Sequence, residues 1–517
     1  MDRRPPLGVL ALAALLHAPV LLAQAPRALP TGPPAAAAAA AATITASDLR
    51  RRLAVIAADS MRGRATPSPE LEQTAAWIAS EFARFGLRPG GDEGSYLQRY
   101  AIRTSVLEPA ASIASFGDAT LRFGRDVAPA YAYLLPQGER SGPLVVISGT
   151  GLAGAALLNA SFAGRHVLIV PPRGSEPRTP AVAAVLRAVL AAGPFGVWLA
   201  SDRADADWAA RGNVELRRRH PSIGDPELLP ALVVRDRAVE AVLAGAGVRL
   251  AELRERARQR VRVDLVPGLR VTLDARTRLV EESFAPNVVG ILPGSDPARS
   301  GEYVVFSAHM DHVGIGVADA AGDSVYNGAD DDGSGTSTVV ELAEAFATLE
   351  PRPARSMIFL TVSGEERGLW GSDWFTAHPP VPIERLVADL NIDMIGRNWT
   401  DTIVAIGREH SDLGATLARV NRAHPELKMT AIDDPWPAES FYTRSDHFNF
   451  ARRGVPVLFF FSGTHADYHK PSDEVAKIDA DKTARIGRLL FYLGLEVASA
   501  SAPPRWDPAS FLAIVGR

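Results

Sequence analysis

Residues 303–312 read Tyr-Val-Val-Phe-Ser-Ala-His-Met-Asp-His, an apolar run that ends in polar residues. The first six residues have the composition of a buried strand. His309 and Asp311 follow this strand and, two residues apart, share a face. A carboxylate at that spacing can orient the ring of a metal-ligating histidine. On its own the pattern also fits two polar residues at an ordinary strand end.

A cluster of acids follows in the segment Gly-Ala-Asp-Asp-Asp-Gly-Ser-Gly, residues 328–335. Three adjacent carboxylates, Asp330, Asp331 and Asp332, repel one another unless a cation or hydrogen-bond donors compensate their charge. The helix predicted to start at Gly335 supplies part of that compensation through its dipole. A solvated acidic turn is the alternative interpretation.

Three further polar groups come directly after, or lie within, predicted strands. Glu365 and Glu366 follow the apolar run 356–362, and adjacent carboxylates there can serve as one metal ligand and one general base. Asp393 lies in an apolar strand, where an acid is costly unless it is paired or metal-bound. His469 follows the very apolar run 455–461 and supplies a second histidine.

Together these groups supply the ligands of a two-metal centre. Two histidines, two aspartates and a glutamate, with one carboxylate bridging, can hold two ions about 3.5–4 Å apart. The chain contains no cysteine, which excludes thiolate ligands, disulfides and a cysteine nucleophile. Oxygen and imidazole ligands suit zinc and also accept manganese or cobalt.

The positions of the polar groups agree with the predicted fold class, which is α/β. Strands are predicted at 287–292, 303–308, 356–362, 386–393, 402–406 and 455–461, and helices at 335–349, 411–423 and 481–498. Strands that alternate with helices predict a mainly parallel central sheet with helices on both faces. Ligands of such sheets bind beyond the carboxyl ends of the strands, where the candidate residues fall.

The rest of the chain divides by composition. Residues 46–110 and 276–500 are expected to form the catalytic domain, and 111–275, with short β-rich runs and Ala-rich helices, an inserted β-rich α/β domain. Residues 1–25 resemble a signal peptide, 26–45 a Pro/Ala-rich linker and 501–517 a C-terminal tail. We therefore expect an exported protein, periplasmic or extracellular, with an uncleaved signal anchor as the alternative. A net charge of -4 predicts no nucleic-acid partner.

These motifs resemble those of the co-catalytic two-zinc aminopeptidases, relatives of bacterial zinc aminopeptidases and of glutamate carboxypeptidase II. The resemblance covers roughly residues 46–110 and 276–500, and the central segment resembles a protease-associated domain. It implies two Zn²⁺ per chain, with Mn²⁺ or Co²⁺ as substitutes. It also implies peptide substrates, whose N-terminal peptide bond is hydrolysed through a metal-bridging hydroxide.

The resemblance also implies roles for individual residues. The metal ligands would be His309, Asp331, Glu366, Asp393 and His469, with Asp331 bridging, Glu365 as general base, and Asp311 and Asp446 as supporting acids behind the ligands. Two tyrosines compete for the role of hydrogen-bond donor to the developing oxyanion. Tyr442 belongs to the pattern Tyr-x-x-Ser-Asp-His at 442–447, and Tyr468 directly precedes His469.

Three other functions remain as alternatives. A carboxypeptidase or dipeptidase on the same scaffold would carry its insert between the later ligands, and the 76 residues from Asp393 to His469 (469 - 393 = 76) are too few for one. A glutaminyl-peptide cyclotransferase generally lacks the inserted domain. A non-catalytic binding protein would have lost ligands, and none is missing from the motifs.

Overall fold

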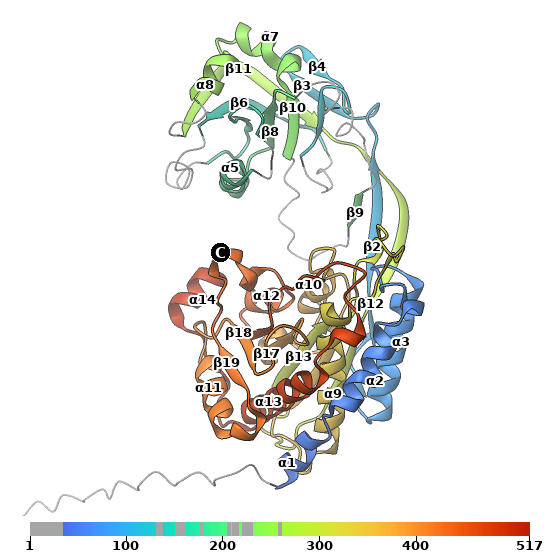
Figure 1. The fold of residues 1–517 in the computed structure, drawn as a ribbon. Helices are drawn as coiled ribbons and strands as arrows, with labels where there is room; N and C mark the ends of the chain where they lie inside the picture. Colours follow the sequence, from blue (N-terminus) through green and yellow to red (C-terminus); the bar gives the residue numbers. More distant parts are fainter. Residues whose placement is uncertain are drawn as a thin grey trace, which may run out of the picture.

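The computed structural model contains two β-sheets, joined by a long pair of strands (Figure 1). It describes residues 35–130, 138–149, 161–175, 177, 179–203, 208, 217–219, 231–256 and 261–516. The predicted signal peptide 1–25 and the first part of the predicted linker lie outside the described residues. Among the described residues, no helix combines the length and apolar composition needed to cross a bilayer.

The centre of the larger, ten-stranded sheet is parallel. Its four middle strands, in spatial order, are β20 (Val457–Phe461), β17 (Leu386–Ile392), β13 (Tyr303–His309) and β16 (Ser356–Val362). Their carboxyl ends therefore meet at one edge of the sheet. These elements confirm the α/β class and the strands predicted from the apolar runs.

Both flanks of this sheet differ from the prediction, because they are largely antiparallel. On one side β18 (Thr402–Ile406) runs antiparallel to β20 and pairs with β19 (Thr430–Ile432). On the other side β16 is followed by β12 (Thr277–Leu292), β2 (Leu97–Leu107) and β9 (Arg217–Arg219), with β1 (Arg88–Pro89) also on β12. Strands β2 and β12 are antiparallel because the chain leaves the sheet along one and returns along the other.

Helices cover both faces of the large sheet, as predicted. One face carries α2 (Ala46–Ile56), α3 (Pro69–Arg84), α9 (Gly335–Thr348), α11 (Leu413–Ala423) and α13 (Ala480–Ser499). The other carries α10 (Trp370–Ala377), α12 (His447–Ala451) and α14 (Pro508–Ile514). The period-2 alternation of β13 divides its side chains between these layers: Val304 and Phe306 join the first core, and Val305 joins the second.

The prediction of a linker at residues 26–45 is wrong for residues 35–42. Residues Ala35–Ala42 form helix α1, and Ala37, Ala40 and Ala41 are buried in the core beside α13. Alanine has the highest helix propensity, and its small side chain lets two helices approach closely. A run of alanines was therefore compatible with a packed helix as well as with a linker.

The C-terminal segment 501–517 is also packed where it is described. The indole of Trp506 donates a hydrogen bond to the carbonyl of Gly454 (2.9 Å), and Ile514 of α14 contacts the core beneath α10 and α12. These contacts join residues 506–514 to the domain of the large sheet.

The second sheet has eight strands. In spatial order they are β4 (Ala119–Leu121), β3 (Ile113–Phe116), β11 (Arg262–Asp274), β6 (Arg140–Ser148), β7 (His166–Val170), β8 (Gly196–Ser201), β10 (Ala231–Arg235) and β5 (Val127–Pro129). Strands β6, β7, β8 and β10 are parallel, and helices α5 (Pro180–Ala191), α7 (Asp236–Gly245) and α8 (Leu250–Arg256) accompany them. We call residues 111–275 the inserted segment. A small hairpin, β14 (Gly314–Ile315) and β15 (Val325–Tyr326), completes the strands.

A buried histidine makes the stability of the second sheet depend on pH. The Nδ1 atom of His166 accepts a hydrogen bond from the indole of Trp198 (3.2 Å), and its Nε2 lies 3.0 Å from the carbonyl oxygen of Arg140. A neutral ring with its proton on Nε2 satisfies both partners. Burial accordingly lowers the pKa of His166 to about 4.

We predict that the inserted segment loses stability between pH 6.5 and about 4. An unfolded histidine titrates near 6.5, so in this window the unfolded chain binds the extra proton and unfolding becomes easier, by about 3 kcal/mol at most. Urea unfolding followed by tryptophan emission checks this. His166→Gln has no titratable group at position 166. As the pH falls, the free energy of unfolding of wild type should therefore decrease more than that of the variant. A difference that stays constant from pH 7 to 4.5 would contradict the assignment.

Candidate metal centre

The candidate ligands converge at the carboxyl edge of the parallel strands. His309 ends β13, Asp393 directly follows β17, and Glu366 lies four residues beyond β16. His469 is in the loop after β20, and Asp331 is in the buried turn Ala329–Ser334 that precedes α9. The structure therefore brings all five predicted metal ligands to one place, where sheets of this class bind ligands.

The three adjacent acids are separated by what each one contacts. Asp332 accepts hydrogen bonds from the backbone amides of His309, Gly335 and Met394 (2.9–3.2 Å). Asp330 accepts one from the amide of Gly396 (2.6 Å). Both carboxylates therefore hold the surrounding backbone in place. Asp330 Oδ2 also lies 3.3 Å from Nε2 of His465, and of the three acids Asp331 is the one that lies between His309 and His469.

Asp331 lies between the two histidines, with one carboxylate oxygen on each side. Its Oδ1 is 3.3 Å from Nε2 of His309, and its Oδ2 is 3.0 Å from Nε2 of His469. Asp393 Oδ1 is 3.6 Å from the same nitrogen of His309, and Glu366 Oε2 is 3.1 Å from that of His469. The result is two adjacent ligand groups that share Asp331.

The chemistry of these atoms fits divalent cations. Asp331 Oδ2, Glu366 Oε1 and Asp393 Oδ1 are buried, and among the described residues they face only nitrogens of the histidines that surround them. A buried carboxylate oxygen without a donor is costly, and a cation removes that cost. Imidazole and carboxylate ligands in this number are those that zinc uses in hydrolytic sites.

The two supporting acids lie behind the ligands. Asp311 is fully buried, and its carboxylate is 3.7 Å from Nδ1 of His309 while its main-chain carbonyl is 3.2 Å from the same atom. It accepts hydrogen bonds from the hydroxyl of Thr66 (2.8 Å) and the amide of Glu365 (3.3 Å). Asp446 accepts one from Ser372 (2.5 Å), and burial raises the pKa of Asp446 to about 7.

Glu365 lines a small cavity together with His309, Asp331 and Asp393. Burial, reinforced by the nearby acids Asp446 and Asp393, raises the pKa of Glu365 well above its usual range. A carboxylate with a raised pKa is a stronger proton acceptor at neutral pH, as general-base catalysis requires.

The two tyrosines occupy different environments. Tyr468 lines the cavity beside the candidate ligands, and its ring stacks on His469 at 3.9 Å between centroids. Tyr442 does not line this cavity. Its ring contacts His410 and His447 at 4.5 and 5.3 Å instead, and its buried hydroxyl has no hydrogen-bond partner among the described residues. The geometry thus favours Tyr468 over Tyr442 for contact with a substrate.

Sequence analysis missed one residue of the centre, His312. Its Nδ1 lies 2.8 Å from Glu366 Oε1 and 3.7 Å from Asp331 Oδ2, within the ligand group of His469. The available signal was its place in the same motif as His309 and Asp311, three residues after the first ligand.

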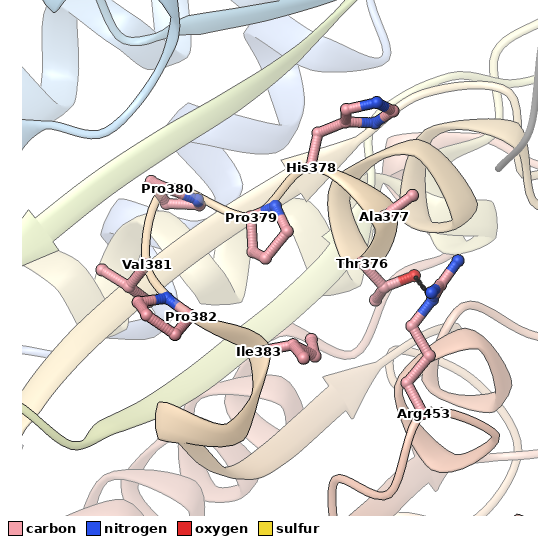
Figure 2. A pocket seen from close by; sticks show the side chains of 9 residues that line it. All are labelled: Thr376, Ala377, His378, Pro379, Pro380, Val381, Pro382, Ile383 and Arg453. Carbon is pink, nitrogen blue, oxygen red and sulfur yellow. Dashed lines mark hydrogen bonds between the residues drawn. The ribbon is translucent and has the colours of Figure 1, made fainter.

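A pocket at the surface of the large-sheet domain is a different site. It has a volume of about 500 Å³ and is formed by residues 376–383 and Arg453 (Figure 2). Thr376 and Arg453 are hydrogen-bonded along one side (3.2 Å). No acid is among its lining residues, and the ring of His378 stacks on Trp374. The pocket therefore offers no set of metal ligands.

Comparison with known proteins identifies the same region. The model of the family described as peptidase family M28 matches residues 287–494. This segment contains every candidate ligand, and the match confirms the resemblance inferred from the motifs.

Individual relatives are similar over part of the chain. A probable leucine aminopeptidase of Trichophyton verrucosum is 27% identical over 236 residues, 44% of this chain and 62% of the relative. A probable zinc metalloprotease of Pyrenophora tritici-repentis is 27% identical over 261 residues, 42% of this chain and 53% of the relative. The chain thus spans a little over half of the length of these relatives. An aminopeptidase structure from Aneurinibacillus sp. strain AM-1 aligns over 91% of this chain and 98% of its own, with 16% identity and a TM-score of 0.48.

We predict that Asp331→Ala loses metal from both ligand groups, because each uses one oxygen of this carboxylate. Metal content after dialysis, measured by inductively coupled plasma mass spectrometry, should fall from about two ions per chain to near zero. Asp481→Ala, at an exposed acid on α13, is the control and should keep the wild-type content. An Asp331→Ala protein that retains two ions would show that another acid bridges.

Proposed function

We propose that this chain, whose residues 287–494 belong to peptidase family M28, is a two-zinc aminopeptidase that removes single residues from the N-termini of peptides. One observation carries the proposal: the two oxygens of Asp331 face His309 and His469 at 3.3 and 3.0 Å, the arrangement of a bridging carboxylate. The names of the similar proteins, a leucine aminopeptidase and a zinc metalloprotease, support the same reaction and metal.

The chain's residues would hold two ions in two groups. His309, Asp331 and Asp393 form one, and the other contains Asp331, Glu366 and His469. Zinc bound in such a pair polarises the scissile carbonyl and lowers the pKa of a water molecule to near neutrality. Manganese or cobalt would be accepted by the same ligands.

Glu365 would move the proton. Its carboxylate borders the cavity next to the ligands, and its raised pKa lets it accept a proton from the attacking water. The same group then donates that proton to the leaving amine. The hydrogen bond from the Glu365 amide to Asp311 ties the position of this base to that of His309.

Tyr468 would stabilise the oxyanion of the tetrahedral intermediate. It lines the cavity, whereas Tyr442 does not. Burial and the neighbouring carboxylates of Asp331 and Glu366 raise the pKa of Tyr468, so its phenol stays protonated and able to donate a hydrogen bond.

The cavity also suggests what the enzyme binds. Its wall includes four large apolar side chains, Met394, Phe441, Phe459 and Phe461, which favour an apolar N-terminal residue. The carboxylates of Asp331, Glu365 and Asp393 border the same space and would attract the free ammonium group of a peptide. Peptides with an N-terminal leucine or phenylalanine are therefore the proposed substrates.

We also propose export, which rests on the sequence of residues 1–25 alone. Arg3 and Arg4 precede an apolar run from Leu7 to Ala23, in the order of a signal peptide. A periplasmic or extracellular location would give the enzyme access to peptides from outside the cytoplasm.

A substrate panel tests the aminopeptidase proposal. Leu-Gly-Gly, its N-acetylated form and N-terminal glutamine peptides are incubated with the zinc-loaded protein, and the products are identified by mass spectrometry. We expect release of free leucine from the first peptide and none from the blocked one. Equal cleavage of both would overturn the proposal. Release of C-terminal residues would indicate a carboxypeptidase, and cyclisation of glutamine without hydrolysis a cyclotransferase.

We predict that Glu365→Gln retains zinc but loses activity. The amide keeps the size of the side chain but cannot accept the proton, so kcat should fall by about 10²–10⁴-fold. Zinc content, measured in the same preparation, should stay at the wild-type value because Glu365 is outside both ligand groups. Near-normal kcat would show that a different group serves as base.

A further inference from the structure

His312 has no role in the reaction described above, although it lies at the centre. It is fully buried; its Nε2 has no hydrogen-bond partner among the described residues, and its Nδ1 faces Glu366 Oε1, an oxygen of a candidate ligand. An imidazole nitrogen and a carboxylate oxygen that face the same group of candidate ligands have the arrangement of two ligands of one metal ion. Its position therefore calls for a ligand.

The surroundings of His312 supply the rest of a metal site. Its Nδ1 is 2.8 Å from Glu366 Oε1 and 3.7 Å from Asp331 Oδ2, and among the described residues the only nitrogens that these two oxygens are shown to face belong to His312 and His469. Its ring stands edge-on to that of His469, with 5.6 Å between centroids. The four residues place one ligand atom each within 4.8 Å of one another.

The backbone fixes the ring in this position. A Cβ atom on Gly328 would lie 2.5 Å from Cγ of His312, so only glycine allows the chain to pass this close to the imidazole. Gly328 also has a positive φ of 58°, which glycine adopts without strain. The amide of His312 donates to the carbonyl of Arg64, which holds the main chain on the other side (3.4 Å).

We propose that His312 is a fourth protein ligand of the group formed by Asp331, Glu366 and His469, so that the two metal subsites are unequal. The first subsite, which we call the closed subsite, then has four protein donors. The second, the open subsite, has three: His309, Asp331 and Asp393. Four protein ligands are typical of tightly held zinc, and three are typical of a position that exchanges ligands. The closed subsite should fill first and release its ion last.

This inference rests on the two-metal centre of the proposed function but does not depend on its substrate. A metal-binding test that uses no substrate distinguishes failure of this inference from failure of the aminopeptidase proposal. If the protein binds two ions in unequal steps yet cleaves no peptide, the aminopeptidase proposal fails and the assignment of His312 stands.

The first experiment titrates the full-length apoprotein with Zn²⁺ in competition with a chromophoric chelator. Wild type should bind two ions with distinct affinities. His312→Gln should weaken the tighter step by about tenfold or more and leave the weaker step unchanged. His309→Gln should weaken the other step, and His378→Gln, at a half-buried histidine stacked on Trp374, is the control. Equal affinities in wild type, or unchanged binding in His312→Gln, would overturn the proposal.

A second experiment uses wild type only and so does not depend on how a variant folds. Co²⁺ is added stepwise, and the exchangeable imidazole protons that it shifts are counted by ¹H NMR. One equivalent should shift two such signals, from His312 and His469, and the second equivalent should add one from His309. A single shifted signal at one equivalent would show that His312 is not a ligand.

Discussion

Buried negative charge at one edge of a sheet is the constraint on which the rest of this structure depends. The carboxylates of Asp311, Asp330, Asp331, Asp332, Asp393 and Asp473 are all less than a tenth exposed and gather beyond the ends of four parallel strands. Acids in this environment must be hydrogen-bonded, protonated or paired with cations. Two compensating groups are visible, backbone amides and a buried arginine, and the predicted metals would be the third. Asp332, Asp330 and Asp473 accept hydrogen bonds from the amides, while Asp331 and Asp393 direct oxygens towards the candidate histidines.

The same compensation positions the ligands. Asp332 connects the amide of His309 to that of Met394, so one carboxylate sets the distance between the ends of β13 and β17. Arg64 is fully buried and donates to the carbonyls of Ile56, Met310, Asn327 and Gly328, and its positive charge lies near Asp311 and Asp331. The guanidinium of Arg64, in the N-terminal part of the chain, thus stabilises loops that contain Met310 and Gly328, which lie 246 and 264 residues later. This network holds the loops that carry the candidate ligands.

Much of this site could be predicted from the sequence, because its acids come at or just after the ends of apolar strands, where a buried carboxylate is tolerated only if it is paired or metal-bound. Asp393 and the Glu365–Glu366 pair are examples. Local pattern could not choose among Asp330, Asp331 and Asp332, since the choice depends on amides that come from other strands. His312 was missed for the same reason. Its partner Glu366 lies in the loop after β16, and no residue close to His312 in the sequence indicates this contact. Helix α1 and the antiparallel strands at both flanks of the large sheet depend on tertiary packing. The periodicity of apolar residues along the sequence gives no information about that packing.

The pairing of β2 with β12 has an evolutionary consequence. Leu107 and Thr277 face each other across this ribbon, so the chain leaves the large sheet and re-enters it at neighbouring positions. Everything between them can therefore change in length or content without moving the ends, since the entropy of closing a longer loop grows only slowly. None of the candidate ligands lies in that interval. The inserted segment could therefore change as a unit without moving the candidate metal centre.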